Sequence, residues 1–247
     1  MNEIIHRIVN FQKHVSDSEA GDKEEISDYI MISCIDKRII PNDFTKVPIG
    51  HLYVVRNAGN FVPTYEHHNE KEISSEGGAI ELAVCHSLIK DIIISGHSDC
   101  KAMDFLSKLN HPDSSEYNSC GPLSQWTRKY GKESWKKYQK YLQDRSKPIQ
   151  FQLKPQPSPP NNAYIDTNLP ILDCLSQINC LQQTENVATF QFLREDLLNH
   201  KLKLHTVWKE ISSSEDDPTL YLFDVHDEKF LKITDESSDH LIHDLDD

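Results

Sequence analysis

Three short apolar runs, residues 28–34, 51–57 and 91–95, constrain the fold of this 247-residue chain more than any other feature. Each has the length and composition of a buried strand and ends in a polar loop. Helical periodicity follows the second and third runs, at residues 76–88 and 101–109. Strands that alternate with helices form a mostly parallel sheet, and its binding sites gather at the carboxyl ends of the strands. The sequence therefore predicts an α/β fold with a central sheet flanked by helices.

The remaining segments predict additions to that sheet within one domain, residues 1–247. From Asp166 to His200 the pattern is mostly helical. Beyond it, three apolar runs predict short strands that add antiparallel edge strands to the sheet: LKLHTVWKEI, TLYLFDV and KFLKI. Three further segments complete the prediction: an N-terminal helical arm at 1–27, a surface insertion with a polar, basic helix and a Pro-rich loop at 105–165, and an acidic tail at 235–247.

The charge balance excludes several classes of partner. The chain holds 26 basic and 39 acidic residues, a net charge of −13, which repels nucleic acid and anionic lipid. No apolar run approaches the roughly 20 residues that span a bilayer. The first residues lack both the apolar core of a signal peptide and the basic composition of a mitochondrial presequence. We expect a protein of the cytoplasm, with the mitochondrion as the alternative, and no nucleic acid or membrane partner.

Metal-ligating side chains stand at the ends of two of the predicted strands. Cys34 closes the first run, and His97 and Cys100 follow the third run in GHSDC. Two thiolates and one imidazole are ligands that Zn²⁺ prefers, and three protein ligands leave the fourth tetrahedral position for water or substrate. Because parallel strands place their carboxyl ends at one edge, the sequence predicts that these three residues form a single zinc site.

The roles of Asp36 and Arg38 decide what such a site can do. The two residues lie two positions apart, on one side of an extended segment, so Arg38 can hold the Asp36 carboxylate away from the metal. That arrangement indicates a catalytic site. If Asp36 instead completes the coordination shell, the chain is a non-catalytic, zinc-containing interaction protein. A further alternative is a thiol hydrolase with Cys34 as nucleophile and His97 as base.

Several blocks of the sequence resemble the β-class carbonic anhydrases, particularly their animal branch. The blocks are CIDKR, HLYVVRNAGN, GGAIELAV and GHSDCKAM, and the similarity runs in order over roughly residues 28–233. The resemblance implies a parallel-sheet α/β domain that dimerises, with N-terminal helices reaching across the partner. It also implies a zinc-dependent enzyme, a carbonate dehydratase, in which zinc-bound hydroxide reversibly hydrates carbon dioxide to bicarbonate and a proton.

The resemblance assigns roles position by position. Cys34, His97 and Cys100 match the zinc ligands of the family, and Asp36 and Arg38 match its catalytic dyad. Tyr53 stands where the family commonly has an aromatic wall of the substrate cleft, although ordinary strand packing explains a tyrosine there equally well. The expected partners are carbon dioxide, water and bicarbonate, together with further copies of the chain in a homodimer or a dimer of dimers.

Overall fold

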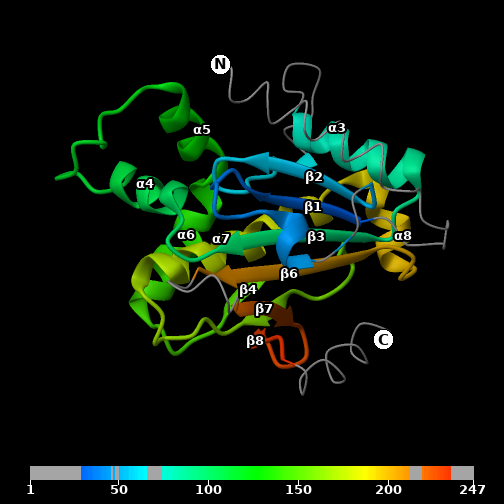
Figure 1. Cartoon of the computed structure of the whole chain (residues 1–247). Helices are drawn as coiled ribbons and strands as arrows, with labels where there is room; N and C mark the ends of the chain where they lie inside the picture. The colour runs from blue at the N-terminus through cyan, green and yellow to red at the C-terminus, as the bar shows by residue number, and fades with distance from the viewer. Residues whose placement is uncertain (1–28, 46, 48–49, 66–73, 212–218, 235–247) are drawn as a thin grey trace, which may run out of the picture.

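The computed structural model of the chain describes residues 29–45, 47, 50–65, 74–211 and 219–234 (Figure 1). Among these residues a six-stranded sheet has the order β2-β1-β3-β6-β7-β8. The strands are β1 (Tyr29–Cys34), β2 (Leu52–Asn57), β3 (Asp91–His97), β6 (Lys203–Glu210), β7 (Thr219–Asp224) and β8 (Lys229–Lys232). The first four strands pair in parallel, and β7 and β8 are antiparallel. The prediction of a mostly parallel sheet with antiparallel strands near the C-terminus is confirmed.

One strand differs from its prediction. The run that forms β6 was expected to be an antiparallel edge strand, but β6 lies inside the sheet and pairs in parallel with β3 over Asp91–His97. The chain returns to the starting end of the sheet through the long helix α7 (Ile171–Ala188) before β6 begins. Because a helical crossover separates the two strands, they run in the same direction.

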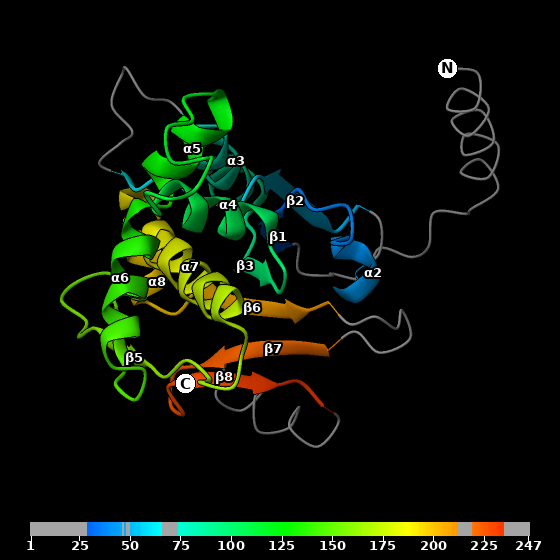
Figure 2. The same ribbon diagram turned by 90° about the vertical axis from the view of Figure 1, so that its left-hand side faces the viewer.

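Helices lie on both sides of the sheet. Figure 2 shows α6 and α7 on one side of the sheet and the short helix α2 on the other. The described helices are α2 (Pro41–Thr45), α3 (Ser75–Glu81), α4 (Lys101–Leu109), α5 (Pro122–Tyr130), α6 (Lys132–Gln143), α7 and α8 (Arg194–Leu198), with a π-helix η2 (Leu82–His86) after α3 and a 3₁₀ helix η3 (Gln191–Leu193) before α8. The helices predicted at 76–88 and 101–109 are therefore present, the first ending at His86.

Helix α7 is buried along most of its length, and its polar side chains bind the loop that follows β2. The Val62 N–H donates to Gln183 Oε1 (2.8 Å), and Asn186 Nδ2 donates to Val62 O (2.8 Å). Asn179 Nδ2 donates to Gly59 O (3.0 Å). A buried amide that is hydrogen-bonded avoids the cost of desolvation, so these side chains can lie in the core while they hold the loop in place.

The segment 105–165 does more than cover the surface, and the prediction of a surface insertion is wrong in that respect. Tyr138 and Tyr141 of α6 are buried, as is Phe151 of β4 (Ile149–Phe151), which pairs with β5 (Asn161–Ala163). These side chains pack in the same core cluster as Leu175 of α7. In α6 the two tyrosines stand among lysines, and that pattern predicted a solvent-exposed helix. The predicted arm at 1–27 and tail at 235–247 lie outside the described residues.

Among the described helices, none combines the length and apolar character needed to cross a bilayer.

Gly96 of β3 offers a test of how tightly the sheet packs on α7. A Cβ at this position would lie 3.2 Å from Cys180 Cβ and 3.2 Å from Trp208 Cδ1, and both of these side chains are fully buried. We expect Gly96→Ala to lower the free energy of unfolding by about 1–3 kcal/mol, because the packed neighbours cannot move aside. Urea denaturation of the metal-replete protein measures the change.

Gly78→Ala is the matched control. Gly78 lies within helix α3, and a Cβ there meets no atom within 4 Å. Alanine should therefore raise the free energy of unfolding by about 0.5–1 kcal/mol through its greater helix propensity. A Gly96→Ala protein as stable as the wild type would contradict the close packing of β3 on α7 and β6.

Candidate metal centre and its surroundings

The structure brings together the three residues that the sequence predicts as metal ligands. Cys34 ends β1, His97 ends β3 and Cys100 stands directly before α4. Their ligand atoms all lie within 4.8 Å of one another, and the two sulfur atoms are 3.9 Å apart. All three side chains are buried. Within the part of the chain that the structure describes, no other group of three such residues could hold a metal ion.

The imidazole of His97 is oriented for metal binding. Its Nδ1 lies 2.7 Å from the carbonyl oxygen of Ser98. A carbonyl oxygen can only accept, so Nδ1 carries the proton and Nε2 keeps a free lone pair. Nε2 is buried and has no hydrogen-bond partner among the described residues. A buried nitrogen without a partner is costly unless a ligand satisfies it, and a metal ion would do so.

The two thiols also fit a metal ion. The hydrogen bond with Cys100 lowers the pKa of Cys34 to about 4, against the opposing effect of burial. The same contact and burial raise the pKa of Cys100. The contact between the two thiols therefore favours loss of a proton from one of them. Because metals bind thiolates, binding of an ion would displace the remaining proton.

Asp36 is not a member of this ligand group, and Arg38 binds both of its oxygens. Arg38 Nε donates to Oδ1 (3.0 Å), Nη2 donates to Oδ2 (2.7 Å), and the backbone N–H of Arg38 donates to Oδ1 (3.0 Å). This bidentate pair holds the pKa of Asp36 below its ordinary value. Asp36 is thus a charged acceptor beside the metal ligands, which favours the catalytic interpretation over a closed metal site.

Two residues that the sequence did not single out donate side-chain hydrogen bonds to backbone carbonyl oxygens of the site. Arg56 of β2 donates from Nε to Cys34 O (3.1 Å) and from Nη2 to Asp36 O (2.7 Å). Ser176 of α7 donates from Oγ to His97 O (2.6 Å). The position of Arg56 at the end of a predicted strand was a usable signal. Ser176 stands 79 residues after His97 and carries no local signal at all.

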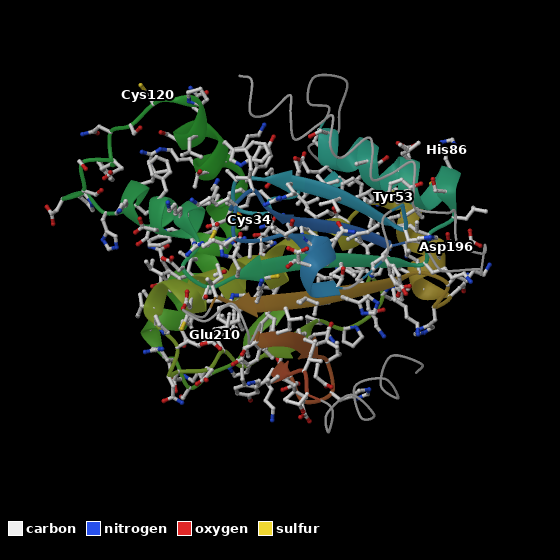
Figure 3. The ribbon with its side chains drawn as sticks, viewed as in Figure 1. Cys34, Tyr53, His86, Cys120, Asp196 and Glu210 are labelled. Atoms are coloured by element: carbon white, nitrogen blue, oxygen red, sulfur yellow. The ribbon has the colours of Figure 1, made fainter. Side chains whose placement is uncertain are left out.

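Tyr53 lies apart from the metal ligands of its own chain. It pairs with Ile30, four residues before the end of β1, and its hydroxyl donates to Ser87 Oγ (3.0 Å). Figure 3 shows Tyr53 and Cys34 toward opposite ends of the sheet. The side chain is 38% exposed, so Tyr53 does not serve as core packing either.

The fold and the site together define a class: an α/β protein that can hold a metal ion with two cysteines and a histidine at the carboxyl ends of parallel strands. A family model described as carbonic anhydrase matches residues 29–215. The β carbonic anhydrase 1 of Caenorhabditis briggsae is 35% identical over 94% of this chain and 88% of its own length. That of Caenorhabditis elegans is 33% identical over 99% of this chain and 93% of its own.

The solved structure of the β-carbonic anhydrase CcaA has the same fold. It superposes with a TM-score of 0.71 and 24% identity, over 95% of this chain and 92% of that one. The chain belongs to the carbonic anhydrase family, a family of enzymes.

The buried Nε2 of His97 leads to a first test of the site. Replacing His97 by alanine removes one of three ligands, and we expect affinity for a divalent metal to fall by at least about 100-fold, since loss of an outer partner alone costs 10- to 100-fold. Bound metal after dialysis against a competing chelator measures the loss. Cys120→Ala removes an exposed cysteine outside the site and should change nothing. A His97→Ala protein that holds metal as firmly as the wild type would exclude His97 from the ligand set.

Proposed function

We propose that the chain catalyses the reversible hydration of carbon dioxide to bicarbonate and a proton, with a zinc ion held by Cys34, His97 and Cys100. The observation that carries this proposal is the buried Nε2 of His97, which has no partner among the described residues and lies beside two sulfur atoms. Membership of the carbonic anhydrase family supports the same reaction.

The donor set supports zinc as the metal. Two sulfurs and one imidazole nitrogen match its preferred ligands, whereas magnesium and calcium prefer oxygen ligands. When bound, zinc supplies a Lewis acid that activates water at neutral pH, as it does in the carbonic anhydrases that hold it with three histidines.

The chain's own residues orient the reactants. Arg38 keeps Asp36 ionised, so that the carboxylate can accept a hydrogen bond from the water that adds to carbon dioxide. Arg56 fixes the backbone that carries Cys34 and Asp36, and so keeps the acceptor at a constant distance from the metal ligands. Atoms balance when one water and one carbon dioxide give bicarbonate and a proton that leaves for solvent.

The two alternative functions have less support. A closed, non-catalytic site needs an Asp36 oxygen on the metal, but both oxygens are engaged by Arg38. A thiol hydrolase needs a nucleophile that its substrate can reach, whereas Cys34 is only 4% exposed and lies against Cys100.

A homodimer is the assembly that the surface supports best. The edge strand β2 exposes Tyr53 and Val54, the π-helix η2 exposes Leu82, and the residues after η2 include Leu88, which is 77% exposed. The hydrogen bond from Tyr53 to Ser87 connects β2 with the segment that follows η2. An apolar surface of this kind, on a sheet edge with which no described strand pairs, favours a second copy of the chain. Because Tyr53 lies away from its own metal ligands, a role at a substrate cleft requires that second copy.

The Asp36–Arg38 pair leads to the central test of this function. Arg38→Ala should retain zinc, because Arg38 contacts no ligand side chain, but kcat for carbon dioxide hydration should fall by about 100-fold, since the acceptor loses its orientation. Stopped-flow hydration assays and zinc content per chain measure the two effects. Lys37→Ala, which removes the exposed neighbouring cation, is the matched control. Near wild-type turnover in Arg38→Ala would remove the pair from the mechanism.

The assembly is tested at the β2 surface. Val54→Asp places a charge on the exposed edge strand, and we expect the mass in solution to change from that of a dimer to that of one 28.5 kDa chain. Light scattering coupled to gel filtration measures the mass, and urea denaturation checks that the chain stays folded. Val225 is exposed and directly follows β7, which lies toward the opposite edge of the sheet from β2, so Val225→Asp should leave the mass unchanged. A Val54→Asp protein that remains dimeric would place the interface elsewhere.

A further inference from the structure

Asp99 has an unusual backbone conformation inside the metal-ligand loop. Its φ is +50°, in the left-handed region that only a few per cent of non-glycine residues adopt. The loop is held on both sides of it: the Ser98 N–H donates to Lys209 O (2.9 Å), and Cys100 O accepts the first hydrogen bonds of α4. The Asp99 N–H donates to Asp173 Oδ1 (2.8 Å) in the first turn of α7. A conformation kept in place by so many contacts often has a function.

In this conformation two oxygens of Asp99 accept hydrogen bonds from Arg38. Arg38 Nη1 donates to Asp99 Oδ2 (2.7 Å), and Nη2 donates to the Asp99 carbonyl oxygen (3.0 Å). The other side of the same guanidinium binds Asp36. Arg38 is therefore held between two aspartates, one on the loop after β1 and the other on the loop after β3.

We propose that Asp99 is a positioning residue of the reaction. It fixes the plane of the Arg38 guanidinium, which in turn fixes the Asp36 carboxylate beside the metal ligands, while Asp173 holds the Asp99 backbone from α7. The inference rests on the proposed function of the Asp36–Arg38 pair.

The alternative role, a surface ion pair that only adds stability, has little support from the geometry. The Asp99 side chain is 76% exposed, and exposed ion pairs contribute little to folding. The Asp99 carboxylate does, however, accept from Nη1 of Arg38, and Nη1 is the guanidinium nitrogen that makes no hydrogen bond to Asp36. The side chain of Asp99 thus restrains rotation of Arg38, which the Asp36 bonds alone restrain from one side only.

The test separates the carboxylate from the backbone conformation. Asp99→Gly tolerates the positive φ but has no side-chain acceptor, whereas Asp99→Asn tolerates it and keeps one oxygen. We expect kcat to fall by about tenfold in Asp99→Gly, with KM and zinc content unchanged, because the carbonyl contact through Nη2 remains. Asp99→Asn should restore kcat to within about threefold of wild type. Equal losses in the two variants, or none in Asp99→Gly, would overturn the proposal.

A second readout does not depend on activity. The Arg38 Nε–H donates to Asp36, so in the wild-type protein its proton should exchange slowly with solvent and give a resolved ¹H–¹⁵N signal, assigned by its loss in Arg38→Lys. In Asp99→Gly we expect exchange about tenfold faster, and in Asp99→Asn a rate close to wild type. A signal that Asp99→Gly leaves unmoved would contradict the positioning role. If no form of the protein hydrated carbon dioxide, the proposed function would fail, and this comparison would still decide whether Asp99 restrains Arg38.

Discussion

The parallel pairing of β1 with β3 is the constraint on which the site depends. Tyr29–Ser33 pairs with Asp91–Ser95. Cys34 follows the last pair by one residue and His97 follows it by two, so both reach the same edge of the sheet. A shift of one residue would turn every side chain of β1 to the opposite face and separate the sulfur from the imidazole. The apolar side chains of Ile30 and Ile32, fully buried on one face, oppose such a shift.

Helix α7 converts that alignment into a rigid centre. It binds the loop after β2 through Asn179, the end of β3 through Ser176, and the metal-ligand loop through Asp173. These three residues lie three positions apart, so they follow one side of the helix. One element therefore sets the relative positions of three loops. An apolar helix could fill the same volume, but it would leave the carbonyl groups of Gly59 and His97 without these donors.

The sequence predicted the fold where the period of the side chains was clear, and the metal ligands where the chemistry was local. The runs that form β1 and β3 are apolar on both faces, and Cys34, His97 and Cys100 stand at their ends. In β6 the alternation of polar and apolar residues resembled that of an edge strand, and only the crossover by α7 decides its direction. The contacts of Asp99 with Asp173 and of Ser176 with His97 join residues more than 70 positions apart. Such contacts follow from the packed structure and not from any local pattern.

The network around Arg38 shows how a weak interaction can still control a reaction. Exposed ion pairs stabilise folding by about 0–1 kcal/mol, so losing the Asp99 carboxylate removes little stability. A misplacement of about 1 Å in a reacting group can nevertheless slow a reaction by about 100-fold. The side chain of Asp36 is only 9% exposed, whereas that of Asp99 faces solvent. The guanidinium therefore connects a nearly buried carboxylate with a solvent-exposed one. Orientation, rather than binding strength, is what the exposed aspartate adds, because Arg38 already satisfies the charge of Asp36.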